Sequence, residues 1–457
     1  MVTAKVEVLG STRVGRLPGG AAEVALLAYP AVLQTLSDTM MQVVDSAIVG
    51  RLGVTELGAV GFGGIWVWTA LCAFVGAATG VQTFVAQALG AGQSKHCGRW
   101  VWQGLYALIP LAVVWVGALA LGFEWLVRLL GPSVEMQHLS TSYALARLCG
   151  APAVVAAVVF SSFFRGLGDT RTPLVVTVIA NVFNAVTTYG LVFGRWGLPA
   201  WGVAGAGAAT ALSNWTFAAV MLGCFLRPRL RGTYATHPAA PDPLAMRRLA
   251  RTSTPIGGQW VLDMISFAIF STIIARMGDT QMAASQAMIQ LLSLSFMQMF
   301  GISIASGALV GRYVGARDLE SAERSHRSAM KLGLLLAAGV AALFLTVPDV
   351  LLSIFTADPA VIAMGRPLLA LGALFQLVDA VGIIVGGSLR GAGDTRYPFV
   401  VSATLAWFVR LPVAYLFAVV LQQGVTGAWC GELIYVTVLG AAWLLRFRSG
   451  VWRTVRI

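Results

Sequence analysis

Long apolar segments separated by short polar connections run through the whole chain. A helix needs about 20 apolar residues to cross the hydrocarbon core of a bilayer, and on that measure the pattern predicts twelve membrane-spanning helices. In the first half they lie near residues 23–49, 57–88, 101–122, 140–164, 173–194 and 202–226, and in the second half near residues 253–275, 283–310, 331–355, 361–388, 398–420 and 425–446. The stretch between the halves is rich in Pro and Arg, which is typical of an exposed linker. We therefore expect an all-α polytopic membrane protein with a first bundle at 1–226, a cytoplasmic linker at 227–252 and a second bundle at 253–457.

The second half repeats polar landmarks of the first half at a constant distance of 225 residues. Pro30, Gln34 and Asp38 in the first predicted span correspond to Pro255, Gln259 and Asp263 in the seventh. The connection RGLGDTRTP, which begins at Arg165, recurs as RGAGDTRYP from Arg390. Because each half holds six spans, both halves enter the membrane in the same sense, as in parallel transporter repeats. We expect two pseudo-symmetric six-helix bundles that face each other across a central cleft.

Composition and charge agree with a membrane location. The 457 residues are 58% hydrophobic and 11% charged, with a mean hydropathy of +0.79, whereas a soluble domain carries about 25% charged residues. With the predicted spans, 24 Lys and Arg residues, among them Lys5, Arg13 and Arg16, lie on the side that holds both termini, and 5 lie on the other side. The positive-inside rule then places both termini in the cytoplasm. The net charge of +12 fits the anionic headgroups of a bilayer better than nucleic acid, so we expect no nucleic-acid partner. We further expect a monomeric multi-pass protein of a bacterial inner (plasma) membrane.

Acidic residues inside the predicted spans are the first candidates for function. A carboxylate at the centre of a membrane helix costs about 2.5–3.5 kcal/mol on insertion scales, so it marks a functional site by default. Asp38 lies near the middle of the first span, Asp263 in the seventh and Asp379 in the tenth. We expect these three side chains to bind an ion or a cationic ligand. Asp45 and Glu23 lie nearer to the membrane faces and are expected to be boundary residues.

Other polar side chains fall at helical spacing and form stripes that would be unfavourable against lipid. The residues expected on this ground to line an internal cavity are Gln34, Gln42, Asn181, Asn184, Thr188, Gln259, Gln290 and Gln376. Arg410 of the eleventh span and Glu432 of the twelfth are candidate counter-charges, and Arg410 could pair with Glu432 or with Asp263 or Asp379. The two RGxGDT connections are expected to be structural turns or hinges on the cytoplasmic side.

These residues resemble the multidrug and toxic compound extrusion (MATE) transporters, and the resemblance covers nearly the whole chain. It is carried by the P-x3-Q-x3-D opening and the RGxGDTRxP connection of each half, by NVFNAVTTYG in the fifth span, by GVAGAGAAT at the start of the sixth and by FQLVDAVGIIVGGSLRGAGDT across the tenth. The resemblance implies two six-helix bundles and cation-coupled export of organic cations or other amphipathic compounds without ATP hydrolysis. It implies no cofactor beyond a coupling ion, which is H+ or Na+.

The resemblance to the NorM-type branch of that family implies roles for single acids. In that branch, acids of spans 1, 7 and 10 serve ion coupling and cargo binding, and Asp38, Asp263 and Asp379 match them. Na+ would then be held at Asp263, Asp379 or Asp38. The branch tends to have a Tyr one turn before the acid of span 10, where this chain has Phe375, which we also expect in the cavity lining.

The DinF-type branch implies a different network, confined to the first bundle. There the acid of span 1 joins Asn and Asp residues of span 5 and a Thr of span 6. Asp38, Asn184 and Thr210 fit this pattern, whereas Thr188 stands where the span 5 Asp is expected. The first-bundle network is therefore present but one carboxylate short.

We expect an antiporter, driven by H+ or Na+, that exports organic cations, drugs or amphipathic metabolites by alternating access. The alternative within transport is a lipid-linked precursor flippase of the wider superfamily, and the alternative from another class is an intramembrane enzyme. The lysines Lys5, Lys95 and Lys331 have no Gly-Lys-Ser/Thr context, and the four histidines form no HExxH pattern. The sequence therefore argues against ATP-driven transport and against an intramembrane metalloprotease.

Overall fold

The computed structural model describes residues 17–130, 133–356 and 358–455. In these ranges the chain forms helices joined by short turns, with no strand, so the predicted all-α polytopic class is confirmed. Lys5, Arg13 and Arg16, which contributed to the orientation argument, lie outside the described residues.

Helices of the first lobe follow the predicted spans closely. They are α1 (Ala21–Val49), α2 (Val54–Thr79), α3 (Val81–Gly90), η1 (Ser94–His96), α4 (Cys97–Leu130), α5 (Val134–Leu148), α6 (Ala151–Leu167), α7 (Arg171–Phe193) and α8 (Gly202–Phe225). Helices α2 and α3 together form the second span, and α5 and α6 form the fourth with a bend of 47° between them.

Helices of the second lobe repeat this order after the short linker helix α9 (Pro228–Tyr234). They are α10 (Pro243–Ala275), α11 (Asp279–Gly315), α12 (Leu319–Thr346), α13 (Pro348–Ser353), α14 (Pro359–Ala392), α15 (Arg396–Leu405), η2 (Ala406–Arg410), α16 (Leu411–Tyr415), η3 (Leu416–Val420), α17 (Gly424–Arg448) and η4 (Val451–Thr454). Helix α10 begins at Pro243, so the end of the expected linker is helical and continuous with the seventh span.

Length and hydropathy alone identify fewer spans than twelve. Ten helices of the described chain are long and apolar enough to cross a membrane, and there are eleven if the bent pair α5–α6 counts as one span. Helix α1 is not among them, although its 29 residues exceed the roughly 20 that a crossing needs. It carries Glu23, Asp38 and Asp45, and this polarity is what makes it a candidate for function.

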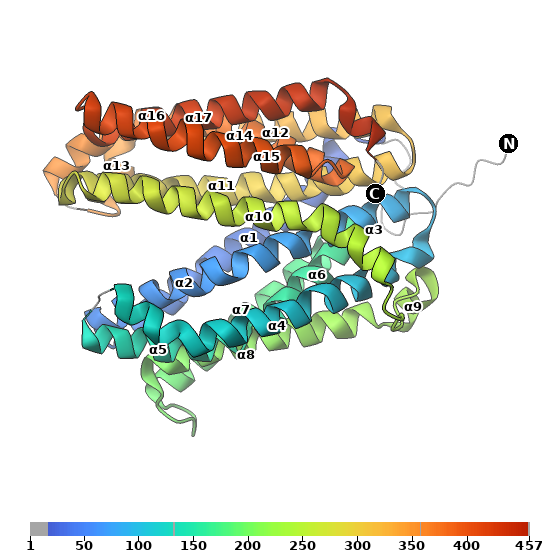
Figure 1. Cartoon of the computed structure of the whole chain (residues 1–457), viewed down its shortest axis with the longest axis horizontal. Helices are drawn as coiled ribbons and strands as arrows, with labels where there is room; N and C mark the ends of the chain where they lie inside the picture. The colour runs from blue at the N-terminus through green and yellow to red at the C-terminus, as the bar shows by residue number, and fades with distance from the viewer. Residues whose placement is uncertain (1–16, 131–132, 357, 456–457) are drawn as a thin grey trace.

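The two lobes lie one above the other in Figure 1, converge at the end that carries both termini and diverge toward the other end. Most contacts between the lobes are made by their first two spans. Helix α1 packs against α11 of the second lobe as well as against α7 of its own, while α2 packs against α10. The polar helix α1 is therefore held between the two halves of the molecule.

The crossing of α3 and α11 closes the end near the termini. Gly90 of α3 lies against the backbone of Arg312, and its counterpart Gly315 of α11 lies against the backbone of Gln87, so that a Cβ atom on either glycine would overlap a carbonyl oxygen. Gln87 and Arg312 are themselves 225 residues apart. The contact is therefore the same when viewed from either lobe. Side chains of α3 add hydrogen bonds across the interface: Gln82 Nε2 donates to the carbonyl of Ile304 at 2.9 Å.

The repeated RGxGDT connections form tight turns at this same end. Gly168 and Gly393 end helices α6 and α14 with φ of +84° and +93°, a conformation that favours glycine. The carboxylate of Asp169 then accepts hydrogen bonds from the backbone N–H groups of Arg171 and Thr172 and so starts α7. Turn geometry explains the Gly and Asp residues of the motif.

The linker is held by the first lobe. Trp102 Nε1 of α4 donates to the carbonyl of Thr236 at 3.1 Å, and Gln103 Nε2 donates to the carbonyl of Ala240 at 2.9 Å. Asp242 caps the N-terminus of α10 and also pairs with Arg99. The chain therefore passes into the second lobe only where α10 begins.

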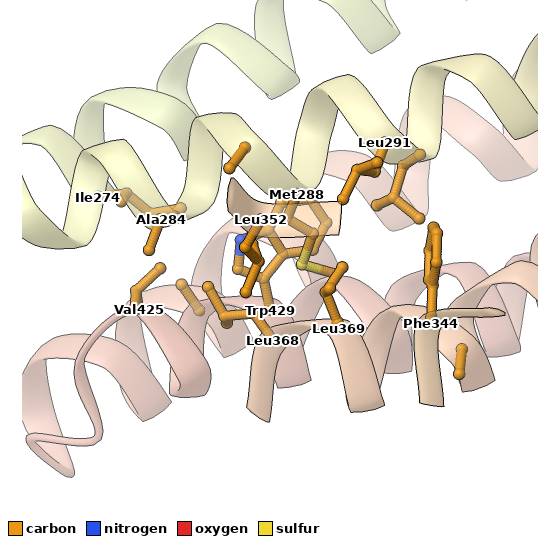
Figure 2. Close-up of a cluster of buried hydrophobic side chains, with 14 of the residues drawn as sticks. Ile274, Ala284, Met288, Leu291, Phe344, Leu352, Leu368, Leu369, Val425 and Trp429 are labelled. Atoms are coloured by element: carbon orange, nitrogen blue, oxygen red, sulfur yellow. The ribbon is translucent and has the colours of Figure 1, made fainter. Parts of the chain in front are cut away.

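Apolar packing makes the second lobe a solid unit at the end away from the termini. Figure 2 shows buried side chains from α10, α11, α12, α13, α14 and α17, among them Met288, Leu352 and Trp429. Trp429 Nε1 is satisfied by a hydrogen bond of 3.0 Å to Ser285 Oγ. Such a cluster favours movement of the lobe as one body over internal rearrangement.

Candidate functional site

Helix α1 presents a buried edge to its neighbours and leaves Asp38 on an exposed edge. Gln34 and Thr35 are buried, whereas Asp38, Met40 and Gln42 are exposed. A carboxylate that faced lipid would be unfavourable, so this edge of α1 is expected to border water between the lobes. Figure 1 places α1 behind α2, next to the second lobe.

Around Asp38, polar side chains of α6 and α7 form a network. Arg165 donates to Gln34 Oε1 at 2.9 Å, and Gln34 Nε2 donates to Thr177 Oγ1 at 3.1 Å. Asn181 Nδ2 donates to the hydroxyl of Ser37 at 2.9 Å and also interacts with the carboxylate of Asp38. The predicted residues Gln34, Asp38 and Asn181 are thus brought together, with Arg165 as their cation.

A second network lies about two helical turns further along α1, around Asp45. Thr188 Oγ1 contacts Asp45 Oδ1 at 3.1 Å and Asn184 Oδ1 at 3.0 Å. Thr210 and Arg147 also interact with the Asp45 carboxylate. Asp45 therefore takes part in a polar network that joins α1 to α7 and α8. The DinF-type pattern expects an Asp in span 5 where this chain has Thr188, and Asp45 of α1 places a carboxylate beside that threonine.

In the second lobe, Arg410 is committed to Glu432. Its Nε and Nη2 atoms donate to the two carboxylate oxygens at 2.6 and 2.5 Å, and the two residues are 7% and 3% exposed. The guanidinium also lies 5.4 Å from the ring centre of Phe267 and 4.7 Å from that of Tyr435. Of the three partners considered for Arg410, the structure selects Glu432.

Asp263 and Asp379 lie beside this pair without joining it. Ser402 donates to Asp263 Oδ1 at 3.0 Å, and Gln259 interacts with the same carboxylate. Asp379 lies close enough to Glu432 and Arg410 to feel both charges. Within the described residues, neither Asp263 nor Asp379, nor Asp38 of the first lobe, forms an ion pair with an Arg or Lys side chain.

A small cavity of about 50 Å³ lies between the lobes, beside Arg165 of the Asp38 network. It is lined from both lobes, by Gln82 and Arg165 of the first and by Trp260, Phe300 and Arg390 of the second. The rings of Trp260 and Phe300 have centroids 6.1 Å apart. Arg165 and Arg390 are the arginines of the two RGxGDT motifs, and the sequence interpretation of these motifs as turns alone missed them. The signal was the repetition of Arg itself, since the turn does not require it.

None of the residues that the sequence predicted to line a cavity is among those that line this one, and neither are Asp38, Asp263 and Asp379. Gln376 is buried and accepts a 2.5 Å hydrogen bond from Ser295. Phe375 packs against Trp429, with ring centroids 6.2 Å apart. Gln290 lines a separate pocket of about 340 Å³ with Phe355, at the end away from the termini. Gln42 is exposed on α1, one turn beyond Asp38.

A sequence profile of the MatE family matches the chain twice, at residues 30–190 and 255–416. The two matches start at the repeated prolines Pro30 and Pro255, and together they cover more than half of the chain.

Curated relatives match over nearly their whole length. A probable multidrug resistance protein NorM from Thermotoga maritima is 30% identical over 433 residues, which cover 94% of this chain and 92% of the relative. The multidrug resistance protein MdtK of Yersinia pseudotuberculosis is 28% identical over 429 residues, which cover 92% of this chain and 94% of the relative.

Solved structures with the same fold include an outward-facing conformation of a multidrug resistance MATE family transporter of the MOP superfamily. It superposes with a TM-score of 0.87 at 20% identity, covering 95% of this chain and 97% of that one. A MOP superfamily transporter from Pyrococcus furiosus gives the same TM-score, identity and coverage. These structures share the arrangement of two repeated lobes. The family profile and the NorM and MdtK relatives show that the chain belongs to the MatE family, whose members are transporters and not enzymes.

Proposed function

We propose that this transporter exports organic cations, including drugs, by antiport against H+ or Na+, and that Asp38, Asp263 and Asp379 bind these ligands in alternation. The multidrug resistance names of its relatives support the cargo class. The observation that carries the proposal is the position of Asp38: an exposed carboxylate halfway along a membrane helix, at the interface of the lobes and outside any ion pair.

Competition for one charge explains how two fluxes can be coupled. A carboxylate in a poorly solvated site is favourable only when a cation or a proton neutralises it. If the lobes change their relative arrangement only in the neutralised state, each passage carries either the coupling ion or the cargo. An affinity coupling of about 1–3 kcal/mol between the two ligands suffices for useful exchange.

The oxygen atoms around Asp38 and Asp263 suit either Na+ or a proton. No three His, Cys, Asp or Glu side chains of the described chain form a cluster that could hold a metal ion. Na+ at Asp38 or Asp263 would therefore take further oxygen ligands from hydroxyl, amide or carbonyl groups, such as those of Ser37 and Ser402, which a hard cation accepts. The same oxygens hydrogen-bond a protonated carboxyl, so both ions remain part of the proposal.

We further propose that the protein is a monomer in a bacterial inner membrane with both termini in the cytoplasm. The excess of Lys and Arg on the side of the termini supports this orientation. In that orientation the lobes in Figure 1 converge on the cytoplasmic side and diverge outward. The alternative of a lipid-linked precursor flippase is less well supported, because the acids Asp38, Asp263 and Asp379 favour a cationic cargo over an anionic lipid phosphate.

The deciding experiment measures uptake of a fluorescent organic cation into proteoliposomes, driven first by a pH gradient alone and then by a sodium gradient alone. We expect one gradient to drive uptake by the wild type and Asp38→Asn to lower that uptake at least tenfold, because the amide can neither release a proton nor neutralise a cation. Asp349→Asn is the matched control, since Asp349 is an exposed acid paired with Arg366. Wild-type uptake by Asp38→Asn would reject the assigned role.

A further inference from the structure

Arg165 is a half-buried cation with unused hydrogen-bonding capacity near Asp38. It lies in the last turn of α6 and donates to Gln34, one helical turn before Asp38 on α1. Its Nε atom is buried and has no hydrogen-bond partner. An unsatisfied buried donor on a charged group is costly, so this position suits the side chain only if it finds a partner in another state.

Asp38 is the acceptor that could satisfy it. Among the residues that the structure describes, Arg165 is the cation that acts on the Asp38 carboxylate, yet the two form no ion pair. An arginine side chain has enough rotatable bonds to move its guanidinium from Gln34 to a carboxylate one turn away. The ion pair would use the free Nε.

The same residue is tied to the closed interface between the lobes. Gly166, the next residue, packs so closely on α3 that a Cβ atom there would lie 2.9 Å from Val85 and 3.0 Å from the carbonyl oxygen of Gln82. Gln82 in turn donates to Ile304 of the second lobe. A movement of Arg165 is therefore felt directly at a contact that holds the cytoplasmic side closed.

We propose that Arg165 is a tethered cation that competes with the exported cation and the coupling ion for Asp38. When a ligand binds at Asp38 and Arg165 is released, the movement of Arg165 changes the contacts at the α3–α11 interface. This inference rests on the proposed role of Asp38. When the site is empty, Arg165 pairs with Asp38. When a ligand neutralises Asp38, Arg165 returns to Gln34 and reaches the state seen here.

The second lobe shows why this role belongs to Arg165 and not to its repeat counterpart. Arg390 Nε donates to the carbonyl of Gly386 in its own helix at 3.1 Å, so that atom is already satisfied. Asp263 accepts from Ser402 and has Arg410 as its stronger cationic neighbour. The repeat therefore provides an internal comparison in which the arginine is fixed.

The test measures binding and turnover separately in Arg165→Gln. Removal of the competitor should tighten binding of a fluorescent organic cation, read by fluorescence polarisation in nanodiscs, about tenfold, while gradient-driven transport falls at least tenfold. Arg165→Lys, which keeps the charge, should keep wild-type affinity. Arg171→Gln, in the same connection but exposed, is the matched control. Weaker or unchanged binding by a correctly folded Arg165→Gln protein overturns the proposal.

A double-mutant comparison separates competition from a structural role. In the Asp38→Asn background, Arg165→Gln should no longer change the affinity, because the site for which it competes has lost its charge. An affinity change that persists in that background rejects the inference. If Asp38→Asn itself transports normally, the proposed function fails first. If it does not, and Arg165→Gln leaves binding unchanged, only this inference fails.

Discussion

At the scale of single residues, the charged groups around Arg410 divide into one satisfied pair and two unpaired acids. Arg410 and Glu432 are joined by two hydrogen bonds and enclosed by the rings of Phe267 and Tyr435. Such a pair has little capacity left for a ligand. Asp263 and Asp379 keep theirs, which is why we assign ligand binding to them.

Arg410 lies near Asp263 and Asp379 as well as Glu432. Its removal should therefore lower the stability of the protein more than removal of Glu432 does. Breaking a buried pair from one side typically costs about 3–5 kcal/mol, whereas replacing both partners with apolar residues can be neutral. We expect Arg410→Met to lower the thermal midpoint of the purified protein strongly, Glu432→Leu less so, and the double variant to recover much of the loss. Glu124→Ala, which breaks an exposed pair with Arg128, is the control and should change little. Equal losses in both single variants would show that the neighbouring acids do not interact with Arg410.

At the scale of elements, the start of α10 depends on one capping carboxylate outside the membrane. Backbone N–H groups of Ala245 and Leu244, together with Arg99, hold the pKa of Asp242 below its ordinary value. A depressed pKa means that the ionised form is the one that stabilises the fold. This contribution is present at neutral pH and is lost as the pH falls through the carboxyl range.

Asp242→Ala should therefore loosen the first turns of α10 in a pH-dependent way. In hydrogen–deuterium exchange, peptides covering 243–250 should exchange faster in the variant than in the wild type at pH 7, and this difference should shrink near pH 3. Asp242→Asn keeps a capping side chain without the charge and should lie between the two. A difference between wild type and Asp242→Ala that stays constant with pH would contradict the role of the charge.

At the scale of the whole molecule, a symmetric scaffold carries an asymmetric site. The crossing of α3 and α11 at Gly90 and Gly315 is identical from both sides. The polar networks are not: the first lobe has Asp45 with Thr188, and the second has Arg410 with Glu432. We infer that duplication produced the symmetric helix crossing and that later substitutions made the polar networks of the two lobes different.

If the crossing closes the cytoplasmic side, widening it should admit reagents from that side. In a variant without native cysteines, we expect Ile304→Cys, which lines the buried cavity, to resist an impermeant maleimide applied from the side of the termini. Gly315→Ala should make it reactive, because the added Cβ overlaps the backbone of Gln87. Gly339→Ala, where a Cβ meets nothing within 4 Å, is the control. Continued protection in Gly315→Ala would show that the crossing does not form the seal.

The scaffold could be predicted from the sequence because its determinants are regular. Apolar length defined the spans, and the distance from Asp38 to Asp263 defined the repeat. The partners of individual charges could not be predicted in this way. Which acid Arg410 selects depends on the rotation of its segment, and Ala406–Arg410 forms a π-helix just before Pro412, a proline that lacks the N–H of a regular helix.

Two residues of the site were missed for a related reason. Asp45 was judged by its depth along one helix, while its role comes from Thr188 on a neighbouring helix. Arg165 was counted as a loop charge, although it lies in the last turn of α6 and lines the cavity between the lobes. Contacts between helices far apart in the sequence leave no trace in spacing along the chain.

Because the glycine crossing lies at one end of the lobes, a small rotation there produces a large displacement at the other end. Gly315 is the last residue of α11, and the 37 residues of this helix extend about 55 Å at 1.5 Å per residue. A rotation of about 10° around the crossing would thus displace the far end of α11 by roughly 10 Å. Small side-chain adjustments at the α3–α11 crossing are therefore enough to change the separation of the lobes at the end away from the termini.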